Sequence, residues 1–194
     1  MSARLENCRK RKEKRQNMKG LIHIYCGDGK GKSTAAAGLA VRAAGRGLKV
    51  LMVRFLKTDD SGEVPVLQGI PGITLVPCDK TFGFTFRMTP EEKKEAAAYY
   101  QQKFLDACRL AGQEGKNQVD LLILDEIMAA VNTGMVSQED VIRFLEEKPD
   151  HLEVVLTGRN PSEKLASLAD YVSEIRAVKH PFTEGVSARE GIEF

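Results

Sequence analysis

The sequence lacks the features that would place a chain in a membrane or in an oxidising compartment. No apolar run reaches the roughly 18 residues that a transmembrane helix needs. The charged N-terminus has no apolar stretch of the kind found in signal peptides, so we expect no signal peptide. The four cysteines include no Cys-x-x-Cys pair and the three histidines lie far apart, which favours neither a disulfide framework nor a zinc site. We therefore expect a cytoplasmic protein with reduced thiols and no membrane partner.

Positive charge is concentrated at the start of the chain. The first twenty residues hold eight Lys or Arg and two Glu, a net of +6, whereas the whole chain carries +2 and the remainder therefore −4. We interpret residues 1–19 as a basic arm and residues 20–194 as one domain, since the length suits a single domain. A solvated tail, a segment that orders over an anionic ligand and a nucleic-acid-binding tail are the alternatives for the arm. We expect no nucleic-acid partner.

A glycine-rich segment follows the first apolar run. It reads Gly27-Asp28-Gly29-Lys30-Gly31-Lys32-Ser33-Thr34. The backbone N–H groups of such a loop hold phosphate oxygens, the lysine adds a mobile positive charge, and the serine hydroxyl can ligate Mg²⁺. The usual pattern has glycine where Cys26 stands, and a glycine-rich turn without a ligand is the alternative. The intact Gly-Lys-Ser sequence, with a strand before it and a helix after it, favours a site for ATP made of these eight residues.

Strand and helix patterns alternate along the rest of the chain. We predict strands over residues 21–25, 49–56, 73–76, 119–124, 154–156 and 171–175. We predict helices over residues 33–45 and 161–168, a helix after a capping box formed by Thr89 and Glu92, and another after Ser137. Helices between strands that are apolar on both sides predict an α/β fold, with a mainly parallel sheet covered by helices on both faces.

Two further polar clusters follow predicted strands. Asp125 and Glu126 come after the apolar strand that ends at residue 124, and Arg159 comes shortly after the next one. Because ligands of parallel sheets bind at the carboxyl ends of the strands, we expect these clusters and the loop to meet at one edge. We predict that Ser33, Asp125 and Glu126 hold Mg²⁺ and that Arg159 binds phosphate. A helix cap and a surface turn are the respective alternatives.

The segment 81–87 is unusually aromatic. Phe82, Phe84 and Phe86 alternate around Gly83, immediately before the predicted capping box. A buried strand would place the three rings on one face. A loop that lays aromatic faces against a large flat ligand fits the pattern as well.

Together these motifs resemble the P-loop ATP:corrinoid adenosyltransferases, also called the cob(I)alamin adenosyltransferase family. The resemblance runs from about residue 20 to the C-terminus. It is carried by residues 27–34, 83–86, 124–126, 156–159, 178–182 and by Gly185. Family members commonly have Asn in place of Asp28, Thr in place of Cys26 and Ser33, and Trp in place of Phe86.

The resemblance implies a RecA-like fold and a specific reaction. The 5′-deoxyadenosyl group of ATP passes to the Co(I) of a corrinoid such as cobalamin, giving adenosylcobalamin and triphosphate in cobalamin biosynthesis or salvage. ATP lies reversed relative to ordinary P-loop enzymes, so the loop, Lys32 and Mg²⁺ stabilise the leaving triphosphate. Lys32 and Glu126 are the implied catalytic residues. Cobalamin and an incomplete corrinoid both stay open as the acceptor.

The resemblance also implies partners for the reduction of cobalt. Phe84 and Phe86 occupy the lower face of the corrinoid and displace its lower ligand, which eases the reduction to Co(I). The electron comes from a reduced flavoprotein, and the enzyme is a homodimer whose basic arm can cover a neighbouring active site. The alternative enzyme is a P-loop ATPase or small-molecule kinase. A nucleotide-dependent module with a basic nucleic-acid arm is a third possibility.

Overall fold

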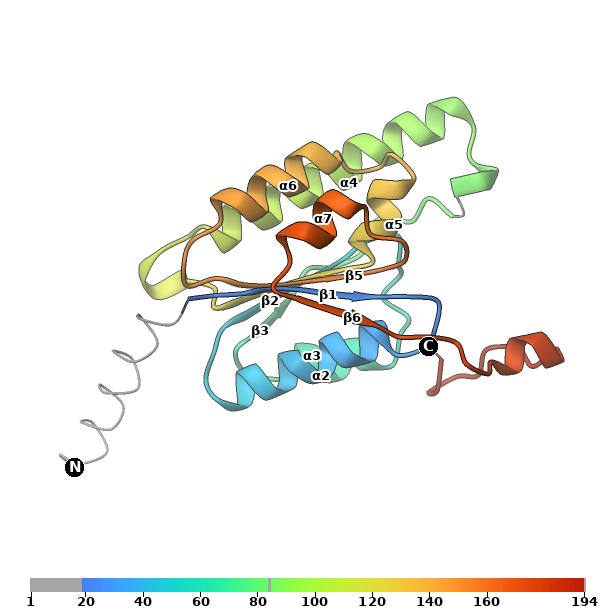
Figure 1. Cartoon of the computed structure of the whole chain (residues 1–194), viewed down its shortest axis with the longest axis horizontal. Helices are drawn as coiled ribbons and strands as arrows, with labels where there is room; N and C mark the ends of the chain where they lie inside the picture. The colour runs from blue at the N-terminus through green and yellow to red at the C-terminus, as the bar shows by residue number, and fades with distance from the viewer. Residues whose placement is uncertain (1–18, 84, 194) are drawn as a thin grey trace.

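The computed structural model of the chain is a three-layer α/β structure (Figure 1). It describes residues 19–83 and 85–193, apart from the side chain of Phe86. The strands are β1 (Ile22–Cys26), β2 (Val50–Arg54), β3 (Ile73–Leu75), β4 (Leu121–Asp125), β5 (Glu153–Thr157) and β6 (Tyr171–Glu174). The α-helices are α2 (Lys32–Gly45), α3 (Glu63–Gln68), α4 (Pro90–Ala111), α5 (Ile127–Asn132), α6 (Gln138–Glu147) and α7 (Glu163–Leu168). The described residues also contain three short 3₁₀ turns, η1 (Thr85–Arg87), η2 (Gly115–Asn117) and η3 (Pro181–Glu184).

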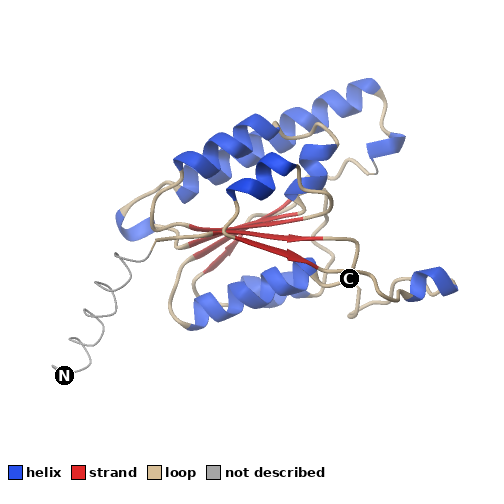
Figure 2. Ribbon diagram, viewed as in Figure 1, coloured by secondary structure: helices blue, strands red, loops and turns tan. Residues whose placement is uncertain are grey.

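The six strands form one sheet in the order β3-β2-β4-β5-β1-β6. Every pairing between neighbours in this sheet is parallel, so all the strands end at the same edge (Figure 2). Strand β5 lies between β1 and β4, which brings the residues after these three strands close together. The predicted α/β fold with a parallel sheet and helices on both faces is therefore confirmed. Among the described residues, no helix is both long and apolar enough to cross a bilayer.

Two apolar cores lie on opposite faces of the sheet. Successive side chains of a strand point to opposite faces, and β4 shows the consequence: Leu122 and Leu124 pack with α4, α5, α6 and α7, whereas Leu121 and Ile123 pack with α2 and α3. Figure 1 shows the same division of the helices. Because both faces are covered, β4 is apolar at every position before Asp125, as the sequence predicted.

The predicted helix ends agree closely with the structure. Thr89 accepts a hydrogen bond from the backbone N–H of Glu92, whose side chain in turn accepts from the N–H of Thr89, so the capping box of α4 is formed. Ser137 caps α6, since its hydroxyl accepts a hydrogen bond from the backbone N–H of Asp140. In α2, small side chains meet the sheet, and Ala36 and Ala40 are fully buried. This close packing holds the N-terminus of α2 against the end of β1.

Three parts of the chain differ from the sequence prediction. The short helices α3 and α5 were not predicted, because six residues are too few for helical periodicity to appear. The buried-strand alternative for residues 81–87 is wrong: residues 81–83 have no regular structure and residues 85–87 form η1. Strand β6 is an edge strand exposed along its whole length rather than apolar on two buried sides.

Candidate active site

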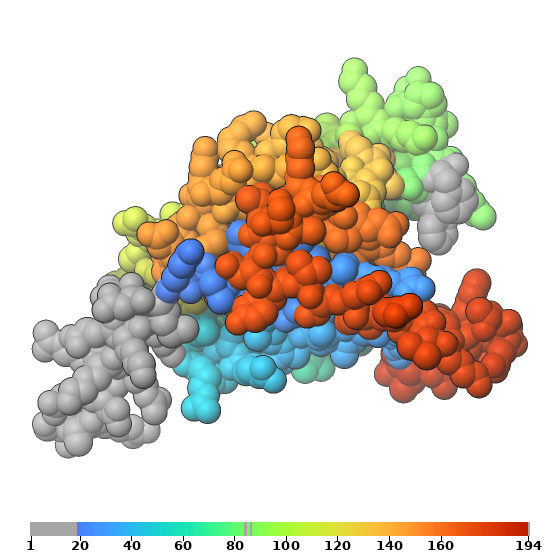
Figure 3. Space-filling model, in the orientation of Figure 1, coloured from blue at the N-terminus to red at the C-terminus, as the bar shows by residue number. Residues whose placement is uncertain are grey.

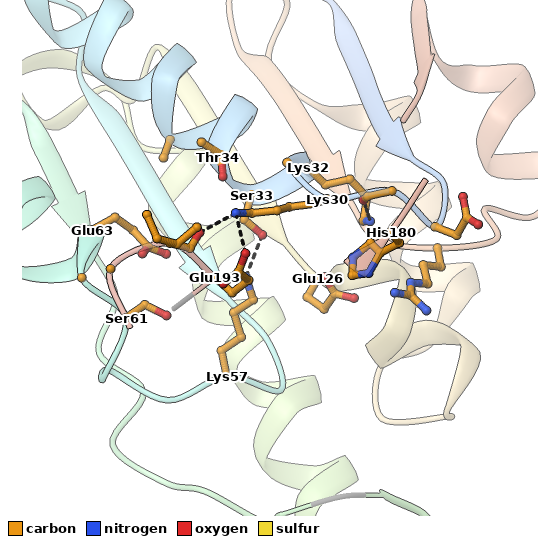
Figure 4. A pocket seen from close by; sticks show the side chains of 18 residues that line it. Lys30, Lys32, Ser33, Thr34, Lys57, Ser61, Glu63, Glu126, His180 and Glu193 are labelled. Carbon is orange, nitrogen blue, oxygen red and sulfur yellow. Dashed lines mark hydrogen bonds and ion pairs between the residues drawn. The ribbon is translucent and has the colours of Figure 1, made fainter. Parts of the chain in front are cut away.

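A cavity of about 620 Å³ opens at the carboxyl edge of the sheet (Figure 4). The residues of the glycine-rich loop from Asp28 to Thr34 form one side of it, and Glu126 and Arg159 line it as well. These residues follow β1, β4 and β5, which are neighbours in the sheet. The predicted convergence of the three polar clusters is therefore observed in the fold.

The loop is shaped by glycines that no other residue can replace without strain. Gly27 and Gly31 have φ angles of 102° and 117°, which favour glycine. A Cβ on Gly27 would lie 2.4 Å from the carbonyl oxygen of Ile175, and the N–H of Gly29 donates to that same oxygen at 2.8 Å. Cys26, where the usual pattern has glycine, ends β1 and is buried. The loop is therefore pressed against the segment that follows β6.

We expect Gly27→Ala to destabilise the protein by about 1–3 kcal/mol, because it adds backbone strain and a steric clash with Ile175. Gly38→Ala is the matched control. Gly38 lies in α2, and a Cβ added there would meet no other atom. Alanine at this position should therefore stabilise the protein by about 0.5–1 kcal/mol. Urea unfolding of both variants measures the difference. Equal effects at the two positions would contradict the close approach of the loop to Ile175.

Lys32 is the buried cation of the loop. It is only 9% exposed, and its Nζ donates to the carbonyl oxygen of Gly29 at 2.8 Å. Burial lowers the pKa of Lys32, and the nearby Arg159 guanidinium lowers it further, whereas Glu126 and Asp28 oppose this shift. The Asp28 carboxylate accepts a hydrogen bond from the N–H of Ala177, which is the main cause of its lowered pKa. Lys32 thus lines the cavity as a buried cation close to a second one, Arg159, and the negative charge of a bound phosphate would offset both.

Asp125 and its partners form a hydrogen-bonded chain beneath the loop. Asp125 is fully buried. Its Oδ1 accepts from the Thr157 hydroxyl at 2.6 Å, and its Oδ2 accepts from Lys57 Nζ at 2.6 Å. Lys57 Nζ also donates to Ser33 Oγ at 2.7 Å. One cation therefore bridges the hydroxyl and the carboxylate that the sequence predicted as Mg²⁺ ligands, so these two oxygens fit a shared metal ion.

Glu126 is held in position by its backbone. Its φ angle of 62° is unusual for a residue other than glycine, and its N–H donates to the Thr157 hydroxyl at 2.9 Å. The turn that ends β4 therefore directs the Asp125 side chain to Lys57 and places Glu126 in the cavity lining. Arg159 lies beyond Gly158, whose α-carbon approaches α5 so closely that a Cβ would meet Met128 at 2.6 Å. Close packing of β4, β5 and α5 thus brings Glu126 and Arg159 to one cavity.

The C-terminal tail forms the remaining wall. Lys30 Nζ donates to the carbonyl oxygen of Ile192 at 2.6 Å and to Glu193 Oε1 at 3.2 Å. Glu193 in turn pairs with Arg189 at 3.1 Å, and His180 also lines the cavity. In Figure 3, the tail and the region before α4 project from the same end of the molecule, with a recess between them. The loop lysine Lys30 therefore contacts the tail in this structure.

Several residues of the site were not predicted from the sequence. Lys57, Ser61, Glu63, His180 and the tail residues 191–193 all line the cavity. Lys57 lies just beyond β2, so the rule that ligands gather where parallel strands end was a signal that pointed to it. His180 lies in the segment 178–182 that helped to carry the family resemblance, whereas residues 191–193 offered no motif. Phe84 and the side chain of Phe86 lie outside the described residues; Phe82 packs its ring against Tyr99 and Tyr100 of α4, with ring centroids 5.5 and 5.8 Å apart.

A parallel sheet that presents a glycine-rich phosphate loop at the end of β1 defines the class of P-loop nucleotide-binding proteins with a RecA-like fold. Within that class the chain belongs to the ATP:corrinoid adenosyltransferase family, because the model of the family described as ATP:corrinoid adenosyltransferase BtuR/CobO/CobP matches residues 18–194. The chain is thus an enzyme that adenosylates corrinoids with ATP. This finding favours the predicted main function over the alternative of a P-loop ATPase or small-molecule kinase.

Relatives that are named as corrinoid adenosyltransferases support this family assignment. The chain is 36% identical over 187 residues to the corrinoid adenosyltransferase of Escherichia coli K12, covering 92% of this chain and 88% of the relative. The same values hold for corrinoid adenosyltransferase CobA of Salmonella typhimurium. The corrinoid adenosyltransferase of Pseudomonas aeruginosa is 30% identical over 177 residues, covering 91% of this chain and 84% of the relative.

Solved structures resemble the chain more loosely. ATPases 2 and 3 of EssC from Geobacillus thermodenitrificans align with a TM-score of 0.45 at 18% identity, covering 90% of this chain and 36% of that one. Domain III of the replication initiation protein DnaA from Thermotoga maritima aligns with a TM-score of 0.39 at 15% identity, covering 84% of this chain and 58% of that one.

Proposed function

We propose that the cavity at the carboxyl edge binds ATP with its triphosphate on residues 27–34, and that Lys32 and Arg159 stabilise that triphosphate as it leaves. The electron pair of Co(I) attacks C5′ of the ribose, the C5′–O bond breaks, and its electron pair departs with the triphosphate. No side-chain nucleophile is needed, so catalysis consists of positioning and charge stabilisation. The observation that carries the proposal is the placement of Lys32, Lys57 and Arg159 around one cavity.

Mg²⁺ is the proposed metal of this site. Ser33, Asp125 and Glu126 would hold it, and when bound it would neutralise part of the negative charge of the triphosphate. The bridging of Ser33 and Asp125 by one ammonium group supports this donor set. The site takes a hard cation because its donors are oxygens of a hydroxyl and carboxylates.

The direct test of the proposal is to mix protein, ATP and chemically reduced cobalamin and to follow the visible spectrum of the corrinoid. We expect the spectrum of the alkylated corrinoid and one equivalent of intact tripolyphosphate for each corrinoid converted. Release of inorganic phosphate without a change in the corrinoid would overturn the proposal and favour a P-loop ATPase.

Phe84 and Phe86 are the proposed contacts of the lower face of the corrinoid. The neighbouring Phe82 is anchored on α4 by Tyr99 and Tyr100, and this anchor fixes one end of the aromatic segment. The described residues just before α4 lie at the end of the molecule where the strands terminate, across a recess from the tail (Figures 1 and 3). A large flat ligand in that recess would lie between the segment and the tail.

We expect Phe84→Ala and Phe86→Ala to impair reduction more than alkyl transfer. Loss of aromatic area would let cobalt keep its lower ligand, so Co(II) would be harder to reduce. Activity should fall more than about tenfold with a mild protein reductant, and less than about threefold with a strong chemical reductant that supplies Co(I). The measurement is the ratio of the two activities in each variant. Tyr171→Ala, which removes a half-exposed ring from β6, is the control.

Equal losses of activity with both reductants would mean that these phenylalanines position the substrate or pack the protein. Phe86→Trp restores the residue that is usual in the family. We expect it to keep or raise the rate with the protein reductant.

The electron donor and the assembly complete the proposal. A reduced flavoprotein supplies the electron, and two copies of the chain form a homodimer in which the basic arm, residues 1–19, reaches a neighbouring active site. The cytoplasm is the proposed compartment, where thiols such as those of Cys26, Cys78 and Cys108 stay reduced. Sedimentation of the full chain as a monomer at assay concentrations would contradict the homodimer.

A further inference from the structure

One lysine occupies the position expected of a metal ion. The Lys57 ammonium lies 2.7 Å from Ser33 Oγ (Figure 4). It also lies 2.6 Å from Asp125 Oδ2. Asp125 is fully buried, and its other oxygen already accepts from Thr157. A buried carboxylate needs a counter-charge, because removing it from water is costly. In this structure Lys57 supplies that counter-charge.

The ammonium and a divalent ion cannot both lie between the same two oxygens. Mg²⁺ would need Ser33 Oγ and Asp125 Oδ2 as direct or water-bridged ligands, and two cations so close together would repel strongly. Entry of a metal–nucleotide complex therefore requires Lys57 to move. The Lys57 side chain is a quarter exposed and lines the cavity, so it has room to turn toward the bound ligand.

The backbone around Lys57 is held by contacts that do not involve the Lys57 side chain. The buried Arg54 donates to the carbonyl oxygen of Thr58 at 2.8 Å and forms an ion pair with Asp59. Asp59 also accepts from the N–H of Cys78 at 3.0 Å. These contacts fix the turn after β2 immediately beside Lys57. A fixed backbone with four rotatable side-chain bonds lets the ammonium change partners without a change in the fold.

We propose that Lys57 closes the metal site in the nucleotide-free protein and transfers its ammonium to the triphosphate when the metal–nucleotide complex enters. This inference rests on the proposed assignment of the cavity to ATP. Lys57 then acts as a second triphosphate-binding lysine in addition to Lys32, supplied by the segment after β2 rather than by the loop. The site exchanges one cation for another, so the buried Asp125 carboxylate is paired in both states.

The first test measures metal binding without nucleotide. Mn²⁺ serves as the probe, and free Mn²⁺ is followed by electron paramagnetic resonance. We expect Lys57→Met and Lys57→Gln to bind Mn²⁺ at least about tenfold more tightly than the parent protein, because the competing cation is gone. Lys57→Gln removes the positive charge but keeps a polar side chain that is only one atom shorter, so it tests the loss of charge apart from the loss of all hydrogen bonding. Lys164→Met removes an exposed lysine of α7 and is the control. Unchanged Mn²⁺ affinity in both Lys57 variants would overturn the closing role.

The second test measures tripolyphosphate binding by calorimetry in the presence of Mg²⁺. We expect Lys57→Met and Lys57→Gln to bind it about tenfold or more weakly, because a charge-assisted hydrogen bond is lost. Unchanged affinity would overturn the triphosphate-binding role of Lys57 and leave the proposed function intact. Absence of tripolyphosphate binding to the parent protein would overturn the proposed function as well. Thermal unfolding of each variant verifies that it is folded.

Discussion

Replacing Lys32 by alanine should lower kcat/KM for adenosyl transfer by about 10²–10³-fold while the protein stays folded. The reason is that Lys32 is a buried cation whose Nζ donates to Gly29 within its own loop. Its removal takes away the positive charge that would face the proposed triphosphate and adds no unpaired buried charge. The measurement is the change in the visible spectrum of the corrinoid, together with released tripolyphosphate.

Lys30→Ala is the matched control for this variant. Lys30 belongs to the same loop, but it is exposed and its ammonium contacts Ile192 and Glu193 of the tail. We expect a loss of less than about tenfold, since exposed charges contribute little. A Lys32→Ala enzyme within twofold of the parent would show that the triphosphate does not lie on this loop.

Replacing Asp125 by asparagine should lower kcat/KM by about 10²-fold and raise the Mg²⁺ concentration needed for half-maximal activity. Asparagine keeps the size of the side chain and an oxygen that can accept from Thr157, but it removes the negative charge that faces Lys57 and the proposed metal. The measurement is the rate of transfer against Mg²⁺ concentration, with circular dichroism as the test of folding.

The variant Thr157→Val tests how much the position of the Asp125 carboxylate contributes to activity, apart from its charge. Thr157 donates to Asp125 and accepts from the N–H of Glu126, so valine would loosen both residues without changing the charge of the site. We expect a loss of activity smaller than that of Asp125→Asn, with a smaller change in Mg²⁺ dependence. An Asp125→Asn enzyme with the Mg²⁺ dependence of the parent would rule out Asp125 as a metal ligand.

Much of the fold was predictable because its signals are local. The strand that ends at Cys26, the helix after it and the capping box of α4 each depend on residues close together in the sequence. The six-residue helices α3 and α5 were missed because they are shorter than two turns. Helix α5 begins directly after Glu126, whose positive φ is fixed by the packing of β4 against β5 and has no sequence pattern.

The sequence by itself determined the chemistry of the loop and the edge of the sheet where it lies. Gly31, Lys32 and Ser33 form a contiguous motif, and an alternation of strands and helices places all strand ends together. Only the tertiary structure decided which side chains meet there. Lys57 and Asp125 are 68 positions apart, and Lys30 and Ile192 are 162 apart. Such contacts depend on the order of strands and the path of the tail, because no local pattern records which distant segments come to pack side by side.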